Sequence, residues 1–117
     1  MVGVFFLSEA DRQACVEELI EAGMFGFIEW DGLTYCEIFS KNAGKGNALL
    51  ALADRIGCRR EQTIGVGDST NDLTLIRSAG LGLAMSNACR ALKNEADEVI
   101  CSNDEHAVQY ILEHYLQ

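Results

Sequence analysis

The sequence predicts an α/β fold in which part of a doubly wound domain with a parallel sheet follows a smaller β-α-β-β segment. From residue 41 onward, short apolar strands alternate with amphipathic helices, a pattern typical of parallel β-α units. Before residue 41, two apolar runs flank Asp31-Gly32, a dipeptide that favours an antiparallel hairpin. We therefore expect two domains, residues 1–40 and 41–117.

Capping and turn residues bound the elements of the first segment. Ser8 precedes acidic residues and favours a helix start, while Gly23 follows the last helical position. The expected elements are a strand over residues 2–7, a helix that ends at residue 22, and strands over residues 25–30 and 34–39.

The sequence of residues 41–117 predicts four helices and three short strands. The strands are expected at residues 63–66, 81–85 and 99–101, and Asn87 is expected to cap the helix that ends at Glu95. The helix over residues 45–56 should bury one face, made of Leu49, Leu52, Ala53 and Ile56. The last helix, capped by Ser102 or Asn103, should bury Ala107, Val108, Ile111 and Leu112, with Tyr115 beside them.

Composition excludes several classes of partner. The 117 residues carry a formal net charge of −9, whereas nucleic acids and anionic membranes are bound by basic surfaces. No apolar run approaches the roughly 20 residues of a membrane helix. The five cysteines include no C-x-x-C pair, which favours reduced thiols. We expect a cytoplasmic protein that binds neither nucleic acid nor membrane.

The strongest chemical pattern lies where the strand over residues 63–66 ends. Ligands of open α/β sheets bind beyond the carboxyl ends of the strands, and there Asp68 offers the hard oxygen that suits Mg²⁺. Asn71 and Asp72 follow in the first helical turn, where free amides and the helix dipole favour an anion. A structural alternative is that Asp68 and Ser69 only cap the helix.

Lys45 supports the functional interpretation over that alternative. It stands between Gly44 and Gly46 at an expected helix start, where a cation opposes the helix dipole. A lysine placed there indicates a negatively charged ligand, although a solvated surface lysine is the commoner case.

Together these segments resemble the haloacid dehalogenase-like superfamily, in particular its Cof-type sugar-phosphatase branch. The family's K-G-x-A-L pattern is matched by Lys45-Gly46-Asn47-Ala48-Leu49, and its G-D-x-x-N-D pattern by Gly67-Asp68-Ser69-Thr70-Asn71-Asp72. A third pattern, A-G-x-G-V-A-M-x-N-A, resembles residues 79–88. The resemblance covers residues 35–117 and implies a partial Rossmann-like core, preceded by the closing β-α-β-β of an α/β cap domain.

The resemblance also implies a role for each matched residue in a magnesium-dependent phosphatase of sugar phosphates or similar phosphomonoesters. Asp68 is expected to bind Mg²⁺. Lys45 is expected to contact the transferring phosphoryl group, and Asn71 the substrate phosphate. Asp72 is expected to support Lys45 or a metal-bound water.

One part of the family pattern is missing from these residues. The aspartate nucleophile belongs in a D-x-D-G-T motif, but Ser8-Glu9-Ala10 and Glu29-Trp30-Asp31-Gly32 match it poorly. The resemblance therefore implies that roughly the N-terminal half of a complete enzyme lies outside this sequence, and we expect no turnover by the chain alone.

Two other interpretations remain, and the parallel sheet adds an expectation about partners. The chain could be a non-catalytic interaction or regulatory module on the same fold, or a receiver-like domain, for which Ser8-Glu9-Ala10-Asp11 supplies a poor acidic pair. In the family, the strand over residues 63–66 pairs with the missing first strand. Its edge should therefore be open, and we expect a homodimer or association through that edge.

Overall fold

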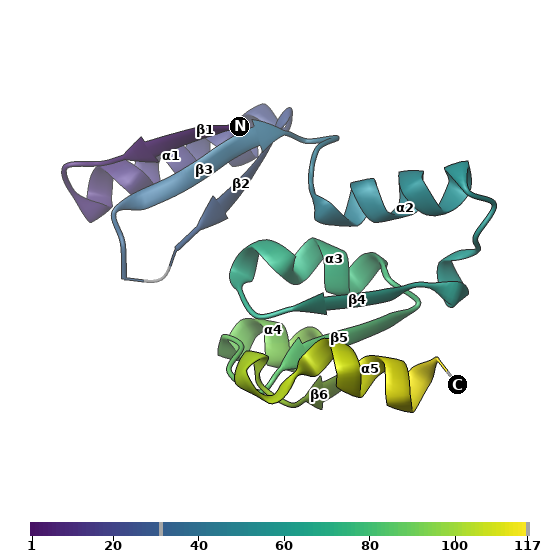
Figure 1. The fold of residues 1–117 in the computed structure, drawn as a ribbon. Helices are drawn as coiled ribbons and strands as arrows, with labels where there is room; N and C mark the ends of the chain where they lie inside the picture. The colour runs from purple at the N-terminus through teal and green to yellow at the C-terminus, as the bar shows by residue number, and fades with distance from the viewer. Residues whose placement is uncertain (31, 117) are drawn as a thin grey trace. The chain divides into compact units, whose positions relative to one another are not determined.

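The computed structural model describes residues 1–30 and 32–116. They form two compact units, Met1–Gly44 and Lys45–Gln117, and each unit has its own three-stranded sheet (Figure 1).

The first unit contains β1 (Val2–Phe5), α1 (Glu9–Ala22), β2 (Phe25–Glu29) and β3 (Tyr35–Ser40). Its sheet has the order β1-β3-β2, and both pairings are antiparallel. The β2–β3 register pairs Phe25 with Ser40 and Glu29 with Cys36, which confirms the predicted hairpin. Asp31, half of the predicted turn dipeptide, lies outside the described residues.

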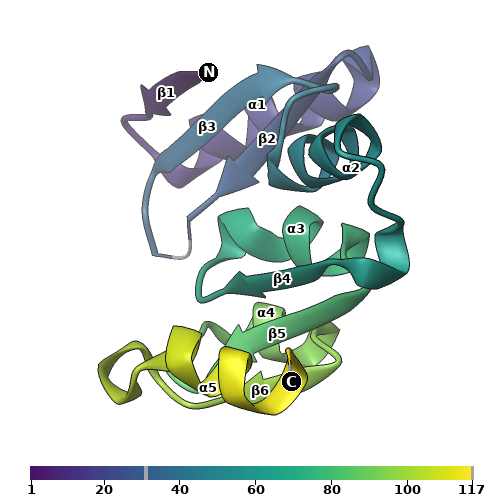
Figure 2. The same ribbon diagram turned by 45° about the vertical axis from the view of Figure 1, so that its right-hand side comes forward.

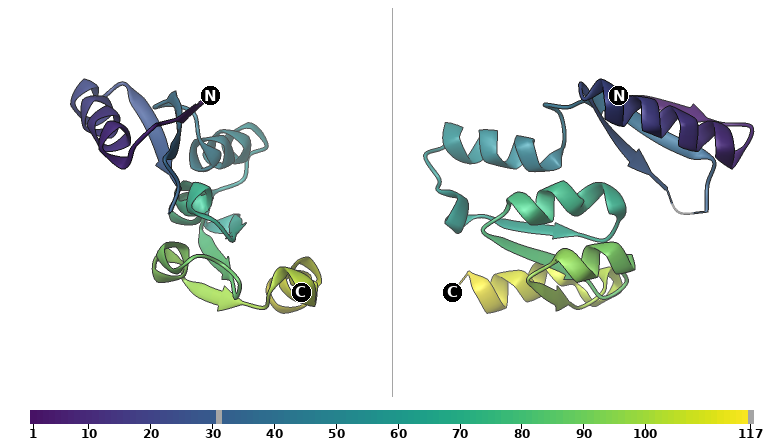
Figure 3. Two further views of the ribbon diagram at one scale, coloured as in Figure 1. Left: turned by 90° about the vertical axis from the view of Figure 1, so that its left-hand side faces the viewer. Right: turned by 180° about the vertical axis from the view of Figure 1, so that it is seen from behind.

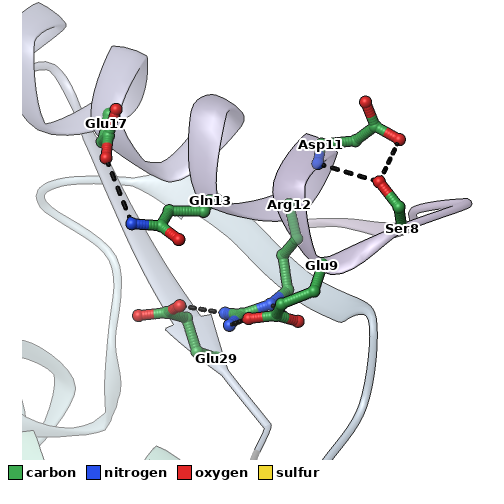
Figure 4. A network of polar contacts seen from close by, with 7 residues as sticks. All are labelled: Ser8, Glu9, Asp11, Arg12, Gln13, Glu17 and Glu29. Atoms are coloured by element: carbon green, nitrogen blue, oxygen red, sulfur yellow. Dashed lines mark hydrogen bonds and ion pairs between the residues drawn. The ribbon is translucent and has the colours of Figure 1, made fainter.

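Local hydrogen bonds explain where α1 begins and how it is tied to the sheet. The Ser8 hydroxyl accepts the Asp11 N–H at 3.2 Å, and Gly23 ends the helix with a φ of 64°. Arg12 pairs with both Glu9 and Glu29, and so links α1 to β2 (Figure 4). Cys36 on the central strand is fully buried.

The second unit is a parallel α/β layer structure, as the sequence predicts. Its helices and strands are α2 (Lys45–Arg55), β4 (Ile64–Gly67), α3 (Leu73–Ser78), β5 (Leu81–Met85), α4 (Arg90–Glu95), β6 (Glu98–Ile100) and α5 (Ala107–Tyr115). Three single 3-10 turns complete it: η1 (Arg60–Gln62), η2 (Thr70–Asp72) and η3 (Asn103–Glu105). The sheet order is β4-β5-β6, and both pairings are parallel.

Two small cores cover the two faces of this sheet. Neighbouring residues on β5 point to opposite faces, so Leu83 joins one core and Ala84 the other. Helices α3 and α4 cover the Ala84 side through Ile76 and Leu92. Helix α5 covers the Leu83 side, and Figure 3 shows α4 and α5 on opposite sides of the sheet.

Two capping predictions are wrong. Helix α4 begins at Arg90, and the side-chain oxygen of Asn87 accepts the N–H of Asn103 at 3.1 Å. Ser102 caps the η3 turn, where Glu105 accepts its N–H at 2.9 Å, and α5 starts five residues after Ser102, behind His106 at a φ of 58°. The Asn87 side chain thus accepts from an amide outside its own segment, whereas the Ser102 hydroxyl donates to the Glu105 carboxylate at 2.7 Å.

The burial predictions for α2 and α5 are right only in part. Ala107 and Ile111 are buried, but Val108 and Leu112 are 71% and 53% exposed. On α2 only Ala53 of the predicted face is buried, and the helix approaches α3 most closely at Gly46, outside that face. In the part of the chain that the structure describes, no helix is long and apolar enough to cross a membrane.

Candidate functional site

The predicted residues gather at the carboxyl end of β4, where the chain enters the η2 turn. Asp72 closes this turn, because its Oδ2 accepts the N–H groups of Asp68 at 3.1 Å and Ser69 at 3.2 Å. Ser69 and Asp72 thus form a capping box at the η2 turn, and the Asp68 side chain takes no part in it. The Asp68 side chain remains exposed beyond the strand end.

Gly67 allows Asp72 to fold back onto the strand. A Cβ atom on Gly67 would lie 2.4 Å from the Cβ of Asp72, a distance that real side chains do not adopt. Gly67 belongs to β4 and is not among the glycines with positive φ. The reason for this glycine is thus close packing against a carboxylate, and not the sharp backbone turn that a glycine at a strand end suggests.

Lys45 reaches the same carboxylate from another element. It is the first residue of α2, and its ammonium group forms an ion pair with Asp72 Oδ1. The next residue, Gly46, is buried against α3, where an added Cβ would lie 2.3 Å from the carbonyl oxygen of Thr74. The contact between α2 and α3 therefore positions the lysine.

The two charges of this ion pair lie in different surroundings. The Asp72 side chain is 7% exposed, whereas that of Lys45 is 50% exposed. Burial acts to raise the pKa of Asp72, but the hydrogen bonds from Lys45 and from the two backbone N–H groups together hold that pKa below its usual value. The carboxylate thus stays ionised, and the half-exposed ammonium can also meet an anion from solvent.

Asp68 and Asn71 both precede Asp72 along the chain. Within the described residues no group hydrogen-bonds the Asp68 carboxylate, while its backbone carbonyl accepts the Cys89 N–H at 3.0 Å. Asn71 is half-buried in the η2 turn. Of the four predicted site residues, the structure joins Lys45 and Asp72 directly, and joins Asp68 to them through its backbone N–H.

The donor set at this position suits Mg²⁺ as one part of a coordination shell. The described residues contain no group of three or more His, Cys, Asp or Glu side chains that could hold a metal ion. Mg²⁺, however, is commonly bound by one or two carboxylates, with water and substrate phosphate completing the shell. The exposed, unshared carboxylate of Asp68 fits that requirement.

Sequence reasoning did not identify two supporting residues on α3. The Thr74 hydroxyl accepts the Gly46 N–H at 3.4 Å, and the Ser78 hydroxyl lies where a Gly46 Cβ would come within 2.5 Å of it. Their spacing of four residues places both on one face of the helix, and this spacing was the available clue.

Among the described residues of the two poor matches to the nucleophile motif, no carboxylate lacks a partner, and Glu9 pairs with Arg12. Ser8 caps α1, and Glu29 pairs with Arg12. The acidic residues after Ser8 lie on the first turn of α1 and not at a strand tip, which also removes the basis for a receiver-like site.

Comparisons with known proteins agree with this architecture. The family of haloacid dehalogenase-like hydrolases matches residues 1–112. Phosphatase YwpJ of Bacillus subtilis (strain 168) is 38% identical over 107 residues, which is 86% of this chain and 38% of YwpJ. The 5-amino-6-(5-phospho-D-ribitylamino)uracil phosphatase YwtE of the same organism is 41% identical over 80 residues, which is 68% of this chain and 28% of YwtE.

A solved structure shows the same similarity in three dimensions. A haloacid dehalogenase-like hydrolase from B. subtilis superposes with a TM-score of 0.84 at 33% identity, covering 97% of this chain and 39% of that one. The chain spans less than half the length of each of these relatives. By its sequence and by its fold, the chain belongs to the haloacid dehalogenase-like hydrolases.

Proposed function

We propose that this chain contributes the lysine and metal-binding part of the active site of a magnesium-dependent phosphatase. The substrates are sugar phosphates or similar phosphomonoesters. The observation that carries the proposal is the Asp72 carboxylate, which binds the Lys45 ammonium through one oxygen and the Asp68 and Ser69 amides through the other. The relatives named as phosphatases support the same reaction class.

Each residue has a distinct task in this proposal. Lys45 places a positive charge beside the phosphoryl oxygens, and Asp72 keeps that charge oriented. Asn71 donates its amide N–H groups to the substrate phosphate, and Asp68 serves as a metal ligand. Mg²⁺ in such a site neutralises negative charge on the phosphoryl oxygens.

The 117 residues contain no D-x-D-G-T sequence, so we propose that the chain does not turn over substrate by itself. The test is the release of inorganic phosphate from para-nitrophenyl phosphate and from a hexose phosphate, with and without Mg²⁺. No release above the buffer rate is expected from the purified chain. Magnesium-dependent release that disappears in the Lys45→Met variant would show that the nucleophile lies within these residues.

The metal site has its own test, which needs no turnover. Mg²⁺ titration followed by amide NMR should shift the resonances of residues 67–72, and the Asp68→Asn variant should lose this response. Asp54→Asn is the matched control, because Asp54 is an exposed aspartate on α2, away from the strand end. Equal responses in the two variants would remove Asp68 as a ligand.

A second candidate function is a non-catalytic interaction or regulatory module, favoured by the same missing motif. A module of this kind requires neither Mg²⁺ nor Lys45 for its function. A chain whose amides at residues 67–72 do not respond to Mg²⁺, and which binds a partner equally well as the Asp68→Asn variant, would support this second function.

A further inference from the structure

The loops that follow the parallel strands of the second unit lie at the carboxyl ends of those strands, and the middle loop bonds to both others. β5 is the central strand, and in Figure 2 its arrow points the same way as that of β4. Residues 86–89 follow β5, and the Ala88 N–H closes them into a turn by donating to the Met85 carbonyl at 2.8 Å. We call residues 86–89 the β5 turn. Its neighbours are the loop after β4, which carries Asp68, and the loop after β6.

On one side, the β5 turn holds the backbone of Asp68. The Cys89 N–H donates to the Asp68 carbonyl at 3.0 Å, and the Cys89 sulfur lies 3.8 Å from the Thr70 hydroxyl oxygen. The Asp68 N–H is bound as well, because it donates to the Asp72 carboxylate at 3.1 Å. Both backbone polar groups of Asp68 are therefore fixed, one by its own loop and one by the β5 turn. Its exposed carboxylate projects from this fixed backbone.

On the other side, the β5 turn is tied to the loop after β6. The Ser86 N–H donates to the Cys101 carbonyl at 3.3 Å, and the Asn87 side-chain oxygen accepts the Asn103 N–H at 3.1 Å. The second contact is made by a side chain, so a substitution can remove it while the backbone contact stays. Asn103 is the first residue of η3, a turn that its own capping box stabilises, so Asn87 is anchored to regular structure.

We propose that Asn87 is a positioning residue for Asp68, the proposed ligand of Mg²⁺. Because Asn87 is anchored to Asn103, the β5 turn keeps the Cys89 N–H in front of the Asp68 carbonyl, and the carboxylate is oriented before the metal arrives. Groups that orient a metal ligand from behind raise the metal affinity, and their removal lowers it roughly 10- to 100-fold. The inference rests on the proposed function, because it takes Asp68 as a metal ligand.

The first measurement uses the 117-residue chain and needs no metal. Hydrogen exchange of the Cys89 amide reports its bond to Asp68, and in Asn87→Ala this exchange should be at least about fivefold faster than in the unmodified chain. Amides of β5 should exchange at unchanged rates, because the loss is local. Asn87→Asp keeps an acceptor oxygen at this position and should restore the protection of the Cys89 amide.

The second measurement is a Mg²⁺ titration followed by the amide resonances of residues 67–72. Asn87→Ala should raise the dissociation constant for Mg²⁺ at least about tenfold. Asn94→Ala is the matched control, because Asn94 is exposed on α4 and its replacement also leaves the charge of the chain unchanged. This control should bind Mg²⁺ like the unmodified chain.

The outcomes separate this inference from the proposed function. If the unmodified chain does not respond to Mg²⁺, the metal site fails and the role of Asn87 fails with it. If the unmodified chain responds, three results overturn the role of Asn87 and leave the metal site intact. They are an unchanged Cys89 exchange rate in Asn87→Ala, faster exchange throughout β5 that Asn87→Asp does not reverse, and equal Mg²⁺ affinities of the Asn87→Ala and Asn94→Ala variants.

Discussion

Asp72 carries a nearly buried carboxylate whose two oxygens bind different partners, the Lys45 ammonium and a pair of backbone amides. Replacing it with asparagine removes the charge that these donors share. We expect Asp72→Asn to lower the free energy of unfolding by about 1–3 kcal/mol, because hydrogen bonds to charged groups are worth more than neutral ones and Lys45 is partly screened by solvent. Urea unfolding measures the change.

Asp68→Asn is the control for this prediction. Asp68 is exposed, and no described residue hydrogen-bonds its carboxylate, so the variant should unfold at nearly the same urea concentration as the unmodified chain. If both variants lose the same stability, the η2 turn is not held by Asp72.

The pKa of Asp72 also predicts how its contribution varies with pH. Because this pKa is lowered in the folded chain, the stabilisation is fully present above the ordinary carboxyl pKa of about 4 and is lost as the pH falls through the lower, folded value. The stability difference between the unmodified chain and Asp72→Asn should therefore be largest at neutral pH and shrink below about pH 4. Urea titrations across this range test the expectation, and a difference that stays constant with pH contradicts it.

At the scale of elements, the contact between α2 and α3 decides where Lys45 lies. Gly46→Ala adds a methyl group where the Thr74 carbonyl oxygen and the Ser78 hydroxyl leave no room. We expect a loss of about 1–3 kcal/mol in unfolding free energy from overpacking. The displaced helix should also withdraw Lys45, so NMR titration should show a higher pKa for Asp72.

Ala51→Ser is the matched control for that element. It adds a single atom at an exposed position of the same helix and should change neither the stability nor the pKa of Asp72. A Gly46→Ala protein as stable as this control would show that α2 can shift without cost.

At the scale of the whole molecule, the proposed chemistry predicts turnover once the rest of a related enzyme is present. A chimera that joins these 117 residues to the part of YwpJ outside the matched region should release phosphate from para-nitrophenyl phosphate in a magnesium-dependent reaction. Lys45→Met should lower kcat/KM at least about 100-fold, because the lysine stabilises charge that develops in the transition state. Circular dichroism should show that this variant is folded.

Lys93→Met provides the comparison, since Lys93 lies on α4 rather than beside Asp72. The Lys93→Met variant should retain activity. Equal activity in the Lys45 and Lys93 variants would mean that Lys45 has no part in the reaction.

The sequence predicted a residue's role well where its interaction partners lie nearby along the chain, and poorly where they lie far away. The order of strands and helices, and the place of Asp68 after β4, follow from periodicity and from neighbours along the chain. The role of Asn87 did not, because its side chain meets the amide of Asn103, 16 residues away. The exposure of Leu52 and Ile56 could not be predicted either. Apolar residues at helical spacing indicate that one face of the helix is apolar, but they do not indicate what covers that face.

The sequence by itself determined the α/β class, the parallel sheet and the set of polar residues near one strand end, because these depend on local patterns. The family resemblance left two roles open for Asp72, and only the tertiary structure decided that Lys45 and Asp72, 27 residues apart, share an ion pair. That contact depends on two glycines, one letting α2 pack against α3 and the other letting Asp72 fold onto β4. Such close approaches arise when elements pack, and no spacing along the chain encodes them directly.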